Sequence, residues 1–204
     1  MKIQNKLPSY NENRHAQLLT KQWNPMKEPA NLTSAILLSI PFMMISALLS
    51  IGIIKIISGI SFSEFGLSAS SFSLTINLEG IVGLFFFVIF HELLHLVFIP
   101  NFLHSDKTYI GLTFWGGFVV SEEEISKARY IIITIAPFII ISVLVPIILG
   151  AFGLLTPLLK FLIVLNAVGS SVDLLNLLLV LKQVPKQATL ISNGPKTYWK
   201  LKKG

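Results

Sequence analysis

The sequence predicts an all-α integral membrane protein with four transmembrane helices and a short interfacial β-hairpin between the second and third helices. Its 204 residues are 53% hydrophobic and only 13% charged, and its mean hydropathy is +0.74. A soluble domain of this size is seldom so apolar. Four stretches without sustained charge are each long enough to cross a bilayer, namely residues 32–54, 81–102, 130–149 and 157–181.

These spans divide the chain into a polar N-terminal segment (residues 1–31), a four-span membrane domain (residues 32–181) and a basic tail (residues 182–204). The first apolar run begins too late and is too long for a cleavable signal peptide, so we expect it to remain as a span. Cysteine is absent. This excludes disulfides, cysteine proteases and zinc sites built from thiolates.

The net charge of +6 is distributed in a way that indicates membrane topology rather than nucleic-acid binding. Fourteen of the 16 Lys and Arg residues lie in the two terminal segments and in the loop between spans two and three, whereas Lys55 and Lys160 lie towards the opposite side. By the positive-inside rule, we expect a multi-pass protein of the cell membrane, embedded in the lipid bilayer, with both termini in the cytoplasm. No nucleic-acid partner is expected.

Helix packing and kinks can be predicted for two of the spans. Span one contains Pro41, Gly52 and serines at 34, 39, 46 and 50, and small residues of this kind let membrane helices approach closely. Span three contains Pro137 and Pro146, which should kink it. Between spans one and two, residues 56–78 are rich in Ser and Phe, and we expect them to lie along the outer surface and help to cover the interior.

The loop between spans two and three carries a strand signal. Residues 108–114 alternate Thr, Ile, Leu and Phe with other residues, and Gly116 and Gly117 follow. This pattern favours a β-hairpin about as much as a simple interfacial loop. A hairpin would offer an edge on which an extended peptide could pair. The three consecutive glutamates at 122–124 are expected to be solvated at the start of span three.

Span two carries the sequence His91-Glu92-Leu93-Leu94-His95. Two histidines four residues apart project from one helix face, where both can ligate zinc, and the glutamate between them lies beside the water that zinc activates. From residue 80 to residue 102 these are the only titratable side chains. Because an acid alone costs about 2 to 3 kcal/mol at such depth, we favour a functional site over a polar cluster that only pins helices together.

Span four supplies a candidate for the third ligand. Asp173 is the only other acid within a span, and it belongs to a polar stripe at helical spacing that must face the bundle interior, formed with Asn166, Gly169, Ser170 and Asn176. Counted from the cytoplasmic ends of their spans, Asp173, His95 and His91 lie at depths of roughly 12, 10 and 16 Å. The three can therefore surround one Zn²⁺ ion, leaving Glu92 free as the general base.

The motif His91-Glu92-x-x-His95 in a membrane span, followed by an aspartate in a later span, resembles the site-2 protease group of intramembrane zinc metalloproteases. It resembles more closely the small bacterial membrane proteins grouped as putative zincin peptidases. The resemblance covers roughly residues 80–181. It implies a zinc-dependent endopeptidase with its metal site inside the membrane, with ligands His91, His95 and Asp173, catalytic Glu92, and a membrane segment or signal-peptide remnant as substrate.

The sequence departs from the site-2 protease pattern around the third ligand. Those proteases have a proline-containing asparagine motif and a Leu-Asp-Gly sequence, whereas this chain has Asn166-x-x-Gly169-x-x-x-Asp173-Leu174-Leu175. By position, the resemblance assigns substrate binding to Asn166. The alternative to an enzyme is a membrane protein that uses the same groups as an inactive scaffold or as a path for metal ions or protons.

Overall fold

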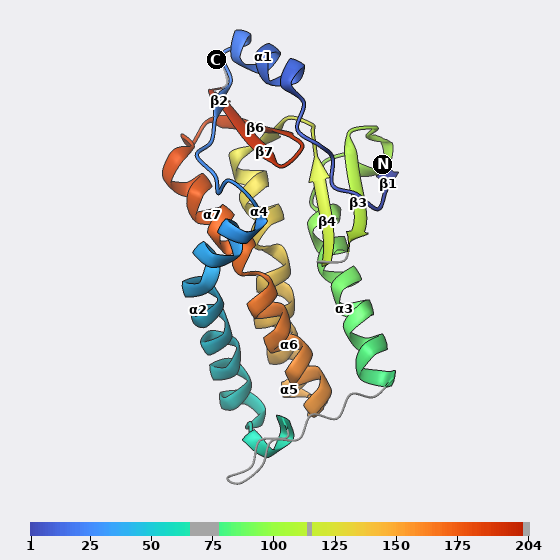
Figure 1. The fold of residues 1–204 in the computed structure, drawn as a ribbon. Helices are drawn as coiled ribbons and strands as arrows, with labels where there is room; N and C mark the ends of the chain where they lie inside the picture. The colour runs from blue at the N-terminus through green and yellow to red at the C-terminus, as the bar shows by residue number, and fades with distance from the viewer. Residues whose placement is uncertain (66–77, 114–115, 202–204) are drawn as a thin grey trace.

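Four helical arms of membrane length form the body of the computed structural model, which describes residues 1–65, 78–113 and 116–201. They are α2 (Leu32–Ser58), α3 (Leu78–Val97), α4 (Lys127–Pro137) continued by the π-helix η3 (Phe138–Leu144) and α5 (Val145–Ala151), and α6 (Pro157–Gly169) continued by α7 (Ser171–Gln183) (Figure 1). By length and composition, each arm can cross a membrane. The arm α3 ends five residues earlier than predicted, because Pro100 follows and disfavours helical geometry before it.

Two small sheets stand at one end of the helices, so the structure is mostly helical but contains more strands than the one predicted hairpin. One sheet has the order β1-β3-β4, from β1 (Lys2–Ile3), β3 (Thr108–Thr113) and β4 (Gly116–Ser121). The other has the order β2-β7-β6-β5, from β2 (Asn24–Pro25), β7 (Lys196–Leu201), β6 (Ala188–Asn193) and β5 (Ile125–Ser126). The antiparallel pair β3/β4 confirms the predicted hairpin.

The second sheet was not predicted, although the sequence contains a signal for it. Gly194 and Pro195 form the two-residue turn between β6 and β7, and glycine at the first position of such a loop is a hairpin signal. Gly194 has φ +57°, which glycine adopts without steric cost. The basic tail is thus partly ordered as a hairpin. Because β2 pairs with β7, the N-terminal segment belongs to the same sheet.

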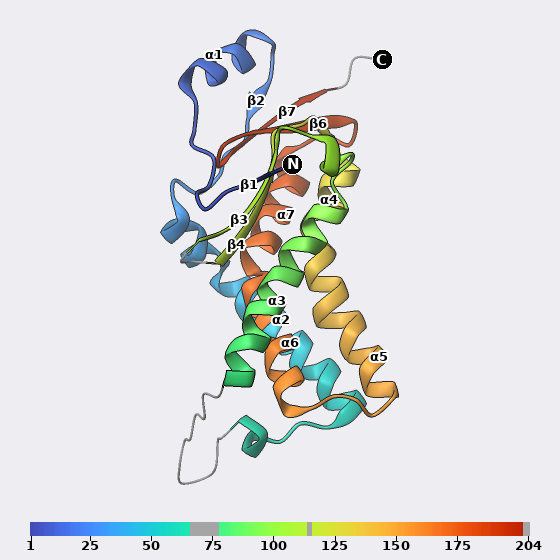
Figure 2. The same ribbon diagram turned by 90° about the vertical axis from the view of Figure 1, so that its right-hand side faces the viewer.

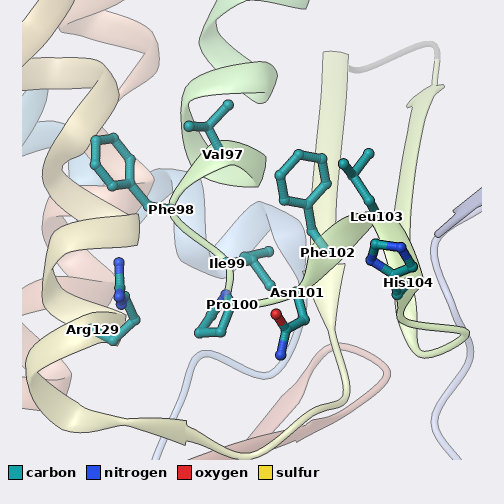
Figure 3. A pocket seen from close by; sticks show the side chains of 9 residues that line it. All are labelled: Val97, Phe98, Ile99, Pro100, Asn101, Phe102, Leu103, His104 and Arg129. Carbon is teal, nitrogen blue, oxygen red and sulfur yellow. The ribbon is translucent and has the colours of Figure 1, made fainter.

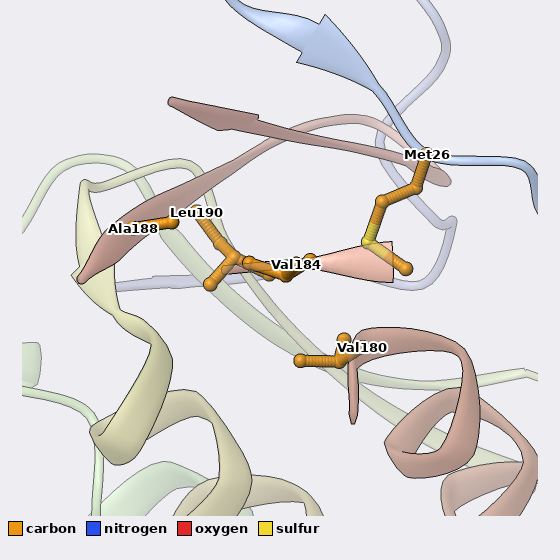
Figure 4. Packing of buried hydrophobic residues seen from close by; sticks show 5 residues of the cluster. All are labelled: Met26, Val180, Val184, Ala188 and Leu190. Carbon is orange, nitrogen blue, oxygen red and sulfur yellow. The ribbon is translucent and has the colours of Figure 1, made fainter. Parts of the chain in front are cut away.

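Both termini and both sheets lie at the same end of the bundle, and η1 (Phe62–Phe65) lies at the opposite end (Figures 1 and 2). We call α1 (Glu12–Thr20) together with the sheet β2-β7-β6-β5 the cap. Beneath the cap sheet is a buried cluster contributed by the end of α7 and by the sheet region (Figure 4), namely Met26, Val180, Val184, Ala188 and Leu190. The cap is therefore packed onto the bundle by an apolar core.

All three glutamates at 122–124 were expected from the sequence to be solvated, but not all of them are. Glu122 forms an ion pair with Arg14 and accepts a hydrogen bond from the backbone N–H of Gly194. It thus ties the loop after the hairpin to the cap. The N-terminus of α4 is capped instead by Ser126, whose side chain accepts from the N–H of Arg129, as serine commonly does at this position.

Three of the four predicted serines of α2 pack inward, whereas Ser34 belongs to the capping box at the start of the helix. Ser39, Ser46 and Ser50 are fully buried, and Ser46 Oγ donates to the carbonyl of Ala167 at 2.7 Å. Small side chains allow this close approach of two helices. At the far end of the bundle, Lys160 Nζ donates to Glu64 Oε2 at 2.7 Å. Most of the segment 56–78, which was expected to cover the interior, lies outside the described residues.

Candidate metal centre

The side chains of α3 and α7 bring together the three ligands predicted from the sequence. His91 and His95 lie one turn apart on α3, and Asp173 lies in the first turn of α7. Asp173 Oδ2 is 3.4 Å from His91 Nε2 and 3.5 Å from His95 Nε2. All three candidate ligand atoms lie within 4.8 Å of one another. The three side chains, which the sequence placed at similar depths in two spans, therefore lie together in the structure.

The geometry of this cluster fits a zinc ion. Zinc binds imidazole nitrogen and carboxylate oxygen at about 2.0–2.2 Å, so a tetrahedral arrangement holds its ligand atoms about 3.4 Å apart. The two histidine-to-aspartate separations agree with that value. Two nitrogens and one oxygen also form a donor set typical of hydrolytic zinc, which needs three protein ligands and one open position. His91, His95 and Asp173 are thus suited to hold Zn²⁺.

The other ring nitrogen of each histidine has a defined partner. His95 Nδ1 lies 2.7 Å from the backbone carbonyl of Ile133, and His91 Nδ1 lies 2.8 Å from Asn166 Oδ1. A carbonyl oxygen can only accept a hydrogen bond, so the His95 contact requires that Nδ1 carries the proton. Nε2 is then the nitrogen that faces Asp173 and can bind a metal. Partners of this kind orient metal-binding histidines and fix their tautomers.

Asn166 is buried among the helices, and both ends of its amide are engaged. Its Nδ2 donates to Ser142 Oγ at 2.9 Å and to the carbonyl of Pro137 at 3.3 Å. With the nitrogen held by two acceptors, Oδ1 is left to accept from His91. The structure thus brings Asn166 to the metal cluster as a partner of a ligand, and its role in binding substrate stays a prediction.

Glu92 lies beside a cavity of about 310 Å³ between α3 and α6. Within the described parts of the chain, its carboxylate makes no hydrogen bond or ion pair. Glu92 packs against the backbone of β4, where a Cβ on Gly117 would lie only 2.2 Å from Glu92 Cγ. Glycine at 117 is therefore required for the hairpin to approach this carboxylate. The sequence had indicated the hairpin but not this contact.

A larger hollow, of about 410 Å³, lies elsewhere, where α3 ends and α4 begins (Figure 3). It is lined by residues 97–104 and Arg129. His104 belongs to this hollow and not to the metal cluster. By size alone, this larger hollow would be chosen as the candidate site. The ligand atoms of His91, His95 and Asp173 instead favour the smaller cavity beside Glu92.

Sequence reasoning missed the groups that support the ligands, namely the carbonyl of Ile133, the carbonyl of Pro137 and the hydroxyl of Ser142. Two of the three are backbone atoms, which no residue pattern marks directly. The signal that was available is Pro137, which was interpreted only as a source of a helix kink.

Comparison with known proteins agrees with this geometry. Residues 84–189, just over half of the chain, match the family described as "putative zincin peptidase". The matched region contains all three candidate ligands and Glu92. No curated protein and no solved structure matches the chain. The chain belongs to the putative zincin peptidase family.

Proposed function

We propose that this protein is a membrane-embedded, zinc-dependent endopeptidase of the site-2 protease kind. It would hydrolyse peptide bonds in membrane segments or signal-peptide remnants. The observation that carries the proposal is the convergence of His91 Nε2, His95 Nε2 and Asp173 Oδ2 beside a cavity that Glu92 lines without being engaged. Three ligands with a separate carboxylate are what metal-assisted hydrolysis requires.

In the proposed mechanism, His91, His95 and Asp173 hold zinc, which when bound would activate a water molecule and polarise the scissile carbonyl. Glu92 accepts the proton of the attacking water. It then donates that proton to the leaving amine as the peptide bond breaks, so that it ends the cycle ionised as it began. Asn166 and the carbonyl of Ile133 keep the two imidazoles aimed at the metal position.

The cavity beside Glu92 supports an apolar peptide as the substrate. Its walls are made mainly of Leu84, Phe87, Leu162 and Leu165, and its rim is formed by Gly116 and Gly117 of β4. In the sheet order β1-β3-β4, strand β4 pairs on one side only among the strands that the structure describes. An extended segment could therefore hydrogen-bond along β4 while its side chains enter the apolar cavity.

We further propose that the four arms lie in the cell membrane, with both termini in the cytoplasm. The charge distribution supports this orientation, and the two terminal segments do lie at one end of the bundle. The metal cluster would then lie nearer to the cytoplasmic surface, buried from lipid by the surrounding helices.

The change Glu92→Gln tests the proposed chemistry. Glutamine keeps the size and polarity of the side chain but cannot accept the proton, so cleavage should fall by about 10²- to 10⁴-fold. Zinc content should stay at about one ion per chain. The measurements are metal analysis of the purified protein and cleavage of a panel of single-span peptides in liposomes.

The matched control is Glu79→Gln, because Glu79 is an exposed acid at the start of the same helix. This variant should cleave like the unmodified protein. Loss of zinc in Glu92→Gln would mean that Glu92 is a ligand or supports one. Retained zinc with no cleavage of any peptide by the unmodified protein would favour the scaffold function instead.

A further inference from the structure

The hydrogen bond from His95 to Ile133 depends on an unusual feature of α4. In a regular α-helix, the carbonyl of residue 133 accepts from the backbone N–H of residue 137. Residue 137 is proline, which has no N–H and whose ring crowds the carbonyl four residues earlier. The carbonyl of Ile133 thus lacks its helical donor, and it is the group that lies 2.7 Å from His95 Nδ1.

Each group in this contact would be costly to bury alone. A backbone carbonyl without a donor among apolar helices, and an imidazole N–H without an acceptor, each lose the hydrogen bond that water would provide. The contact satisfies both. Pro137 is itself fully buried within the bundle. The proline therefore leaves the carbonyl of Ile133 available at the point where α4 passes His95.

We propose that Pro137 is a positioning residue of the metal centre. By removing the helical donor, it reserves the carbonyl of Ile133 for the Nδ1–H of His95 and so directs His95 Nε2 towards Asp173. The proposal deepens the proposed function and rests on it, because it assumes that His95 is a metal ligand.

The same stretch of helix also supports the second histidine. After Pro137 the arm continues as the π-helix Phe138–Leu144. The carbonyl of Pro137 and the hydroxyl of Ser142 accept from Asn166 Nδ2, and Asn166 Oδ1 accepts from His91. One proline and the irregular turn after it thus hold the outer nitrogens of both histidines.

The test compares two replacements of Pro137. Pro137→Ala restores the N–H at this position, so the carbonyl of Ile133 can return to the helix ladder. Replacement of Pro137 by lactic acid, the α-hydroxy analogue of alanine, removes the ring in the same way but adds no N–H. The two chains differ in the N–H donor, and the ester linkage also makes the carbonyl of residue 136 a weaker acceptor. Pro41→Ala, in the interior of α2, which carries no ligand, controls for removal of a helix proline as such.

The readout is the zinc dissociation constant of purified protein, measured by competition with a chromophoric chelator. We expect zinc to bind about tenfold more weakly to Pro137→Ala, at the lower end of the loss caused by removing a group that supports a ligand. The lactic acid chain and Pro41→Ala should stay within about twofold of the unmodified protein. Equal loss in both position-137 chains would assign the effect to ring packing and overturn the proposal, as would unchanged affinity in Pro137→Ala.

A second readout, in zinc-free protein, does not depend on the metal. The ring nitrogen chemical shifts of His95 report which nitrogen carries the proton. We expect the Nδ1-protonated form to be more populated in the unmodified protein and in the lactic acid chain than in Pro137→Ala, and equal populations would overturn the proposal. An unmodified protein that binds no zinc but shows this difference would contradict the proposed function, and it would support only the orientation of the His95 ring that Pro137 allows.

Discussion

The helical bundle and the cap place apolar and polar residues in opposite ways. In α2, Leu48 is 66% exposed while Ser50 is fully buried. In the cap, Leu190 is 1% exposed, while Lys186, in the turn that leads into β6, lies at the surface. The first pattern is typical of helices that face lipid, and the second is typical of domains that face water. The two patterns fit the proposed placement of the bundle in lipid and of the cap in water, and the candidate metal centre lies among the polar groups inside the bundle.

The contrast between the bundle and the cap depends most on the proposed topology, in which the two ends of the bundle lie on opposite sides of the membrane. Because cysteine is absent, single substitutions can be labelled without background. Ser61→Cys, beyond the far end of α2, should react with a membrane-impermeant maleimide only from outside intact cells. Lys186→Cys, before β6, should react only after the cells are opened. Labelling of both positions from the same side would contradict the proposed topology.

The change Asp173→Ala tests whether the polar groups inside the bundle bind zinc. With only two histidines left, zinc should be held so weakly that most of it is lost on purification, a larger effect than the 10- to 100-fold loss caused by removing a supporting partner. Metal analysis of the purified variant provides the measurement. Asn176→Ala, one turn later on the same helix, should keep about one zinc per chain. Full occupancy in Asp173→Ala would exclude Asp173 as a ligand.

A matched pair of leucines compares the two packing patterns directly. Leu190→Ala removes a buried side chain from the cap cluster and should lower the free energy of unfolding by about 2 to 5 kcal/mol. Leu48→Ala removes the same atoms from the exposed face of α2 and should change it by less than about 0.5 kcal/mol. Thermal unfolding in one detergent can measure both. Equal losses would mean that this face of α2 packs against protein.

The smallest expected effect concerns Glu28 in the N-terminal segment. Burial raises the pKa of Glu28 above its ordinary value of 4.5, against the opposing effect of the hydrogen bond from the N–H of Thr197. The protonated form is thus favoured in the folded state. This contribution to stability is present below pH 4.5 and is lost as the pH rises through the folded-state pKa.

Glu28→Gln keeps an acceptor for Thr197 and cannot ionise. The advantage in unfolding temperature of Glu28→Gln over the unmodified protein should therefore grow as the pH rises through this window. Thermal unfolding of both proteins at several pH values provides the measurement. Parallel curves for the two proteins would contradict a raised pKa.

Features of the fold that depend on local sequence could be predicted. Hydropathy located all four arms, and the alternation before Gly116 located the hairpin β3/β4. The pairing of β2 with β7 was missed because β2 has only two residues and its partner lies far away in the sequence, as Asn24 and Trp199 do. The ion pair between Arg14 and Glu122 was missed for the same reason, since a run of three acids gives no indication of which one will be buried.

The sequence by itself determined that His91 and His95 share one helix face with Glu92 between them, because helical periodicity places residues four apart on one side. Asp173 could be selected as the third ligand because it is the only other acid within a span and lies at a depth in the membrane similar to that of the two histidines. Only the tertiary structure decided how the two imidazoles are held, by Asn166, 75 residues from His91, and by the carbonyl of Ile133, 38 residues from His95. Such contacts depend on how separate helices cross, and the one from Ile133 also uses a backbone atom whose availability depends on the residue four positions later.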